Sequence, residues 1–122
     1  MENNFIPYEQ ALALKELGFD YPFFGYYTGD KMRLVIKPAI RRDTKLCCKA
    51  PLFQQAFEFF RELKLVPSII YLPDHNGYNF NITIHRDKYY DEFWGLLGDN
   101  TSYKEVEIEC LKKLIEIANE NV

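Results

Sequence analysis

The stretch VPSIIYLPDHNGYNFNITIH, residues 66–85, decides the fold class of this 122-residue chain. Asn76 and Gly77 tolerate positive φ angles and together form the strongest two-residue signal for a β-hairpin turn. After this pair, apolar and polar residues alternate, as Tyr78, Phe80, Ile82 and Ile84 against Asn79, Asn81, Thr83 and His85. Because successive side chains of a strand point to opposite sides, this period predicts a half-buried strand.

A second hairpin is predicted upstream of this one. Aromatic and β-branched residues flank the turn pair Gly29-Asp30, so we expect strands at Phe23–Thr28 and Lys31–Ile36. Pro38 ends the second strand, because proline cannot donate a hydrogen bond to a ladder. The stretch from there to Lys49 is expected to be irregular or a short edge strand.

Three amphipathic helices accompany the hairpins. Pro7 suits a first helical position and Gly18 suits the residue beyond a helix end, which predicts a helix from about Pro7 to Leu17. A second helix begins at Pro51 in PLFQQAFEFFREL. Its apolar stripe consists of Phe53, Ala56, Phe57 and Phe60, widened by Leu52, Phe59 and Leu63.

The third helix is the most regular element. Ser102 and Glu105 form a capping box at its start. Its apolar arc consists of Val106, Cys110, Leu111, Leu114, Ile115, Ile117 and Ala118. Glu107 is the exception, because it points into the apolar side near the first turn. We favour an exposed helix start there, where the helix dipole stabilises an acid, over a functional carboxylate.

The order of these elements, α-β-β-α-β-β-α, predicts an α+β fold. We expect one domain over residues 1–122, with a small antiparallel sheet from two hairpins packed by three helices on one side. The segment RDKYYDEFWGLLGDN, residues 86–100, fits either a helical turn or a ragged connection that carries Trp94.

Composition and cysteine usage exclude several classes of protein. The net charge of −3 argues against a protein that coats nucleic acid. No apolar run approaches the roughly 20 residues that cross a bilayer, and no secretory signal is recognisable. The cysteines, Cys47, Cys48 and Cys110, are odd in number and lack the spacing of zinc ligands. Free thiols fit a cytoplasmic protein, and we predict no membrane association, metal or cofactor.

The sequence contains no recognisable catalytic motif. His85 lies on the polar side of its predicted strand and is the better candidate for a general base. His75 belongs to a turn rich in polar residues, and Cys110 lies on an apolar helix face where a thiol is usually inert. We therefore predict no catalytic residue, favour a solvated role for His85, and keep a small enzyme that uses it as one alternative.

A basic segment between Lys31 and Lys49 supports a second alternative. It contains seven basic residues and one acidic residue, a net charge of +6. The candidate phosphate contacts are Lys31, Arg33, Lys37, Arg41, Arg42 and Lys45, with Tyr26 and Tyr27 as possible stacking partners for bases. We favour a solvated sheet edge whose cations oppose strand aggregation over a nucleic-acid site.

The same charge asymmetry supports protein binding. The chain from Glu62 onward has six basic and eleven acidic residues, a net charge of −5, whereas the preceding part has a net charge of +2. Such a polarised surface can steer a charged partner or a second copy arranged head to tail. Aromatic residues make up 16% of the chain and provide material for a binding patch.

The strings FIPYEQALALKELGFD, APLFQQAFEFFREL and EIECLKKLIEI resemble a group of short proteins encoded in bacterial phages, prophages and other mobile elements. This resemblance covers all three predicted helices. It implies a cytoplasmic bacterial or phage protein, and it implies no activity, cofactor or catalytic residue. Our leading prediction is a non-catalytic module that binds another protein or itself. Nucleic-acid binding through residues 31–49 and an enzyme based on His85 are the alternatives.

Overall fold

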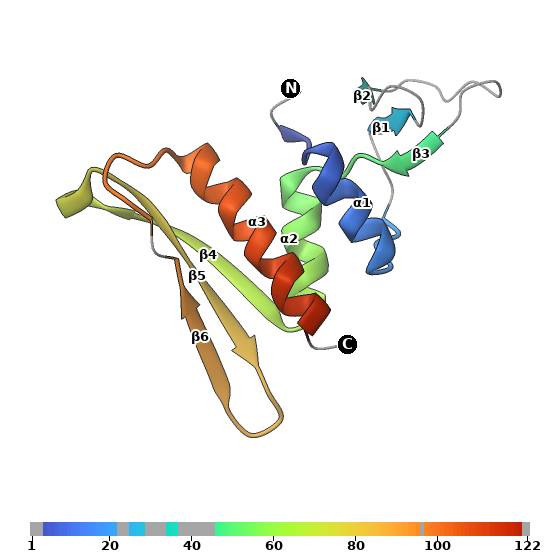
Figure 1. The fold of residues 1–122 in the computed structure, drawn as a ribbon. Coiled ribbons are helices and arrows are strands. Elements are labelled where there is room, and N and C mark those ends of the chain that lie inside the picture. The colour runs from blue at the N-terminus through green and yellow to red at the C-terminus, as the bar shows by residue number, and fades with distance from the viewer. Residues whose placement is uncertain (1–3, 22–24, 29–33, 37–45, 96, 121–122) are drawn as a thin grey trace. The chain divides into compact units, whose positions relative to one another are not determined.

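The computed structural model describes residues 4–21, 25–28, 34–36, 46–95 and 97–120, with the backbone alone at residues 28, 35, 36 and 46–49. They belong to two compact units, Met1–Ala56 and Phe57–Val122. Figure 1 labels the helices and strands of both units.

The fold belongs to the α+β class, and the predicted order of helices and hairpins is confirmed. The two hairpins do not share the one small sheet that was predicted. Each pairs with an additional strand, and the described strands form two antiparallel sheets, β2-β1-β3 and β4-β5-β6. The elements are α1 (Tyr8–Glu16), β1 (Gly25–Thr28), β2 (Leu34–Ile36), β3 (Leu46–Lys49), α2 (Phe53–Glu62), β4 (Leu65–Leu72), the short 3-10 helix η2 (Pro73–His75), β5 (Gly77–His85), β6 (Tyr90–Trp94) and α3 (Tyr103–Glu120).

In the first unit, α1 has the predicted bounds to within a residue. Pro7 is its N-cap, and Gly18 follows its end with a φ of 94°, which glycine adopts without strain. The helix lies beside β3 and buries Leu14 completely. The Tyr27 hydroxyl in β1 donates to the Ile6 carbonyl at 2.6 Å, which joins the sheet to the segment before the helix.

The hairpin predicted in this unit is present, because β1 and β2 pair in antiparallel register. Its turn, Gly29-Asp30, lies outside the described residues. On the other side of β1 lies β3, which is therefore an edge strand. This confirms one of the two structures expected for the stretch that ends at Lys49.

Helix α2 buries the predicted aromatic stripe. The buried members are Phe53, Ala56, Phe57, Phe59 and Phe60. Leu63 was predicted to widen the stripe, but it is 47% exposed because the helix has already ended at Glu62. Lys64 follows with a φ of 66° and leads into β4.

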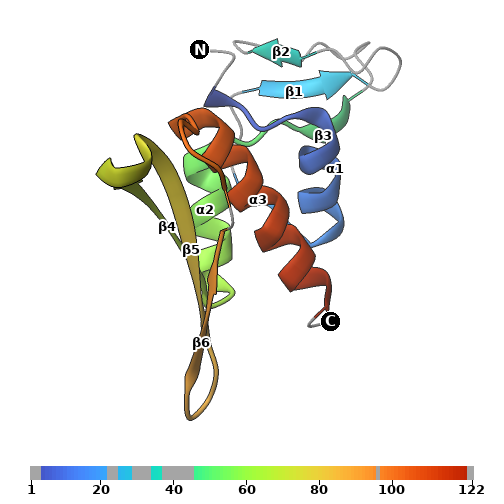
Figure 2. The ribbon, with the colours of Figure 1, turned by 60° about the vertical axis from the view of Figure 1, so that its left-hand side comes forward.

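In the second unit, α3 packs on one face of the β4-β5-β6 sheet, which we call the helix face (Figures 1 and 2). The Tyr78 ring contacts the Tyr103 ring of α3, with centroids 5.4 Å apart. Phe80 and Ile82, on the same side of β5, are buried as the alternation predicts. The polar set from Asn79 to His85 lies on the opposite face, which we call the outer face.

Helix α3 confirms the predicted cap and apolar arc. The Glu105 N–H donates to Ser102 Oγ at 3.2 Å, and all seven predicted members of the arc are buried. The exposed helix start predicted around Glu107 is wrong, because that side chain is only 14% exposed. It pairs with Lys104 at 3.0 Å, one turn away, and this local partner compensates the buried carboxylate.

The connection between β4 and β5 differs from the predicted two-residue turn. Leu72 pairs with Gly77, so Pro73–Asn76 form a four-residue connection in which only Asn76 has a positive φ, 48°. A Cβ added to Gly77 would lie 2.6 Å from the Thr101 backbone nitrogen. This glycine is therefore required by the close approach of the segment before α3, not by a left-handed turn.

Residues 86–100 include a strand where a helical turn or ragged connection was predicted. Tyr90–Trp94 form β6, which pairs with Asn81–His85 of β5. Only Phe93 among these five residues supplies a large apolar side chain to the helix face, next to the charged Asp91. The sequence of these residues therefore lacks a clear alternation of apolar and polar side chains. Their extended conformation results from pairing with β5.

Candidate functional site

The six predicted phosphate contacts lie outside the described residues. They are Lys31, Arg33, Lys37, Arg41, Arg42 and Lys45. Their proposed stacking partners, Tyr26 and Tyr27, are buried at 2% and 7% exposure. Neither ring is therefore available to stack on bases, as the nucleic-acid alternative suggested.

His85 ends β5 on the outer face and is exposed. Its backbone N–H donates to the Lys64 carbonyl at 3.0 Å, and its ring centroid lies 6.5 Å from that of Tyr90. It borders an open hollow formed with the turn Arg86–Tyr89. In the described part of the chain the His85 side chain has no hydrogen bond or ion pair, so the orienting group that a general base requires is not found there.

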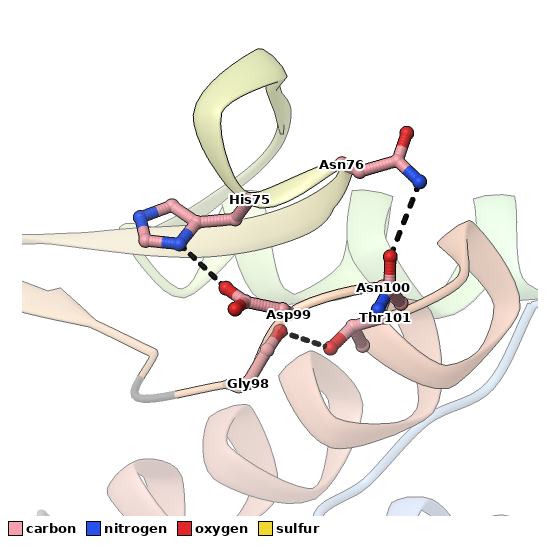
Figure 3. A network of polar contacts seen from close by, with 6 residues as sticks. All are labelled: His75, Asn76, Gly98, Asp99, Asn100 and Thr101. Carbon is pink, nitrogen blue, oxygen red and sulfur yellow. Dashed lines mark hydrogen bonds and ion pairs between the residues drawn. The ribbon is translucent and has the colours of Figure 1, made fainter.

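A polar network joins the β4–β5 connection to the segment before α3 (Figure 3). His75 Nδ1 lies 2.7 Å from Asp99 Oδ1, and Asn76 Nδ2 donates to Asn100 Oδ1 at 3.1 Å. The Asn100 N–H in turn donates to the His75 carbonyl at 2.9 Å. Sequence reasoning assigned His75 to a turn and missed Asp99, because 24 positions separate the two residues.

This network connects two loops that are distant in the sequence. The His75 and Asp99 side chains are 59% and 69% exposed, so water competes for their contact. The nearby Thr101 hydroxyl, a conceivable nucleophile, donates to the Gly98 carbonyl at 2.6 Å (Figure 3). The backbone bond between Asn100 and His75 does not depend on either side chain, which favours a structural role.

Cys110 is fully buried in α3. Burial, with a smaller contribution from the nearby Glu107, raises the pKa of its thiol to about 12. The thiol is therefore protonated at neutral pH and is a poor nucleophile or metal ligand. Among the residues that the structure describes, no three histidine, cysteine or acidic side chains are grouped as a metal site would need.

Strand β6 lies at the edge of its sheet. Its hydrogen bonds with β5 show which of its backbone groups point away from β5. The Gly95 N–H donates to the Phe80 carbonyl at 2.9 Å. Every second residue of an antiparallel strand bonds to a given neighbour, so Phe93 and Asp91 also turn toward β5. The residues whose N–H and C=O groups point away from β5 are Tyr90, Glu92 and Trp94.

These three residues also share the outer face, and we call them the edge stripe. Tyr90 is 62% exposed and Trp94 is 49% exposed, with Glu92 between them. Trp94 Nε1 donates to Glu92 Oε2 at 3.4 Å, a long and exposed contact. Asn81, the strand partner opposite Trp94, is only 9% exposed, and its buried Nδ2 has no hydrogen-bond partner among the described residues.

An open groove of about 260 Å³ lies on the helix face, between β6 and α3. Its lining combines the apolar side chains of Phe80, Phe93 and Leu97 with charged residues of α3, which are Glu109, Lys112, Lys113 and Glu116. Lys113 Nζ lies 4.4 Å from the Phe93 ring centroid and 3.2 Å from Glu116 Oε1. One strand edge is thus flanked by an aromatic and acidic stripe on one face and by a groove with apolar and charged walls on the other.

Comparison with known protein families, with curated proteins and with solved structures finds no match. None of the helices in the described ranges is long and apolar enough to cross a bilayer. The chemistry of the β6 surface is therefore the basis on which a function is inferred.

Proposed function

We propose that this chain is a non-catalytic module that binds another protein, acting in the bacterial cytoplasm in a phage or mobile-element setting. The observation that carries the proposal is the edge stripe, in which two large aromatic side chains are about half exposed or more on an edge strand. Burial of such rings against a partner removes apolar surface from water. Tyrosine and tryptophan also dominate the energetic centres of protein interfaces.

The charge of the edge stripe favours a protein over a nucleic acid. Glu92 lies between the two rings, where its carboxylate would repel a phosphate backbone. The chain from Glu62 onward also has a net charge of −5. The basic segment of residues 31–49 remains the sequence-based support for nucleic-acid binding, at a different part of the chain.

Affinity capture from the native host, with and without nuclease, tests this proposal. Combined Tyr90→Ser and Trp94→Ser substitutions should reduce recovery of the partner by about tenfold or more, because two aromatic anchors are lost. Tyr71→Ser is the matched control, since Tyr71 is 50% exposed on β4, the opposite edge strand. This control should leave recovery unchanged.

A partner that survives nuclease and is lost only in the double variant would support the proposal. Equal recovery by the wild type and the double variant would overturn it. Recovery that nuclease abolishes, with steep salt dependence and sensitivity to Arg41→Glu and Arg42→Glu, would assign the function to the basic segment instead.

A further inference from the structure

Three features of β6 occur together at one edge. Backbone N–H and C=O groups at every second position point away from β5. The edge stripe lies on the outer face, and the groove lies on the helix face. A strand added beside β6 would meet all three, because its backbone would pair with the edge and its side chains would alternate between the faces.

Building on the proposed function, we propose that β6 binds an extended segment of the partner protein by antiparallel strand addition. The segment has an arginine or lysine directed to the outer face and apolar residues on either side of it directed to the groove. In this mode the main chain supplies affinity, and the alternating side chains supply specificity.

The edge stripe is the reason for proposing a basic residue in the partner segment. A residue directly opposite Glu92 shares its face, with the two Cβ atoms about 5 Å apart. Within the described ranges the Glu92 side chain has one polar contact, the long one from Trp94 Nε1, so its carboxylate can accept from an incoming cation. The rings of Tyr90 and Trp94 stand two positions to either side and can contact the same cation through their faces.

The groove is the reason for proposing apolar residues on either side of that basic residue in the partner segment. Neighbours of the basic residue point to the opposite face, toward Phe93 and the space between β6 and α3. The groove has a volume of about 260 Å³, and its apolar part, formed by Phe80, Phe93 and Leu97, suits branched aliphatic side chains. Its α3 side is lined by the charged residues Glu109, Lys112, Lys113 and Glu116. The Lys113 ammonium lies over the Phe93 ring, 4.4 Å from its centroid, and an incoming apolar side chain would share this ring with it.

A second copy of β6 fits this edge less well. Antiparallel pairing of two copies over their full length places Tyr90 opposite Trp94 and Glu92 opposite Glu92 of the other copy. Like charges directly opposite one another destabilise a strand pair. A basic residue in a different protein removes this repulsion and replaces it with attraction.

Titration of the full chain with synthetic peptides tests the proposal, with amide hydrogen exchange followed by NMR. The probe is a threonine-rich soluble peptide whose central residues are Val-Arg-Val. Binding should slow exchange at Tyr90, Glu92 and Trp94, while Asp91 and Phe93, whose amides face β5, should not change. Methylation of the arginine backbone nitrogen should abolish binding, whereas methylation of a flanking valine nitrogen should preserve it.

Charge reversal tests the recognition of the basic residue. Glu92→Lys should weaken binding of the Val-Arg-Val peptide roughly three- to tenfold and should favour a Val-Glu-Val peptide. Asp74→Lys makes the same charge change at an exposed site in η2 and should alter neither affinity. Glu92→Pro removes an N–H that points away from β5 and should abolish binding of both peptides.

Alternate-residue protection together with the charge swap would establish strand addition. Uniform protection, equal binding of both methylated peptides, or binding of none of the probes would overturn it. If the probes fail while partner capture still depends on Tyr90 and Trp94, strand addition is wrong and protein binding stands. Protection of β6 that appears without peptide as protein concentration rises would identify a second copy as the occupant and overturn the proposed partner.

Discussion

Strands β4 and β6 flank the same central strand, yet they end the sheet in different ways. The bond from the His85 N–H to the Lys64 carbonyl sets the alternation on the β4 side. Leu65, Pro67, Ile69 and Tyr71 therefore turn their backbone groups away from β5. Pro67 has no N–H, so the β4 edge lacks one of the donors that an added strand would need.

The connections of the two strands differ as well. The β4–β5 connection is tied to the segment before α3 by the network around His75 and Asn76 (Figure 3). The β5–β6 turn, Arg86–Tyr89, borders an open hollow, and Arg86 Nε reaches Asp91 Oδ2 at 3.2 Å on the surface. Strand β4 therefore lacks one outward N–H donor, and its connection to β5 is held by hydrogen bonds. Strand β6 keeps all its outward donors and exposes its side chains.

The two edges differ in burial and in residue identity. The first two outward positions of β4, Leu65 and Pro67, are buried, whereas all three of β6 are exposed. Pro67 costs the sheet no ladder bond, because its nitrogen faces away from β5. At the equivalent outward positions of β6 the chain has Tyr90, Glu92 and Trp94. Charged residues and prolines commonly prevent an edge strand from pairing with another chain, and of these three residues only Glu92 belongs to that group.

The largest expected effect tests which backbone groups of β6 face β5 and which face away from it. Phe93→Pro removes an inward N–H and a ring that packs 6.0 Å from Phe80, so it should lower the free energy of unfolding by about 3 kcal/mol or more. Glu92→Pro changes an outward position and should cost less than about 1 kcal/mol. Urea unfolding measures both values, and equal losses would show that the alternation is assigned incorrectly.

A smaller effect tests the anchoring of the β4–β5 connection. Gly77→Ala places a Cβ 2.6 Å from Thr101 backbone nitrogen and 3.0 Å from its carbonyl oxygen. Because backbone atoms cannot swing aside, we expect a loss of about 2 kcal/mol in the free energy of unfolding. The control is Gly98→Ala, whose Cβ would meet nothing within 4 Å and which should change stability by less than about 0.5 kcal/mol. A Gly77→Ala variant as stable as this control would contradict the close approach.

The smallest expected effect concerns association rather than folding. Pro67→Val gives the β4 edge a full set of donors, and valine is close to proline in size. At the same high concentration we expect the variant to self-associate more than the wild type, with a gain of about 1 kcal/mol or less per new strand contact. Sedimentation velocity measures the distribution, and identical profiles would show that Pro67 does not protect this edge.

The helices were predictable because their signals are local. The Ser102–Glu105 cap and the seven-residue arc of α3 lie within a single helix, where a period of 3.6 residues specifies the buried side. The prediction failed at Glu107 because a local pattern does not specify how deeply a side chain is buried. The pattern shows which side it faces, but its burial and its pairing with Lys104 depend on packing.

The candidate site was less predictable because its parts are joined by pairing. Tyr90, Glu92 and Trp94 are close in sequence, but their common face and outward backbone groups exist only when β5 sets the register. The groove combines Phe80 and Leu97 with residues of α3, which are distant in the chain. The alternating Tyr-x-Glu-x-Trp pattern was the available signal, and the mixed charges beside Phe93 concealed it.

The amino-acid sequence by itself determined the α+β class, the positions of the helices and the central alternation of β5, because caps and periodicity act over a few neighbouring residues. Only the tertiary structure decided that β6 is a strand, that Gly77 is needed at Thr101, and that one sheet has one interrupted edge and one available edge. These features depend on hydrogen bonds and close contacts between segments far apart in the chain, and no local pattern encodes such distances.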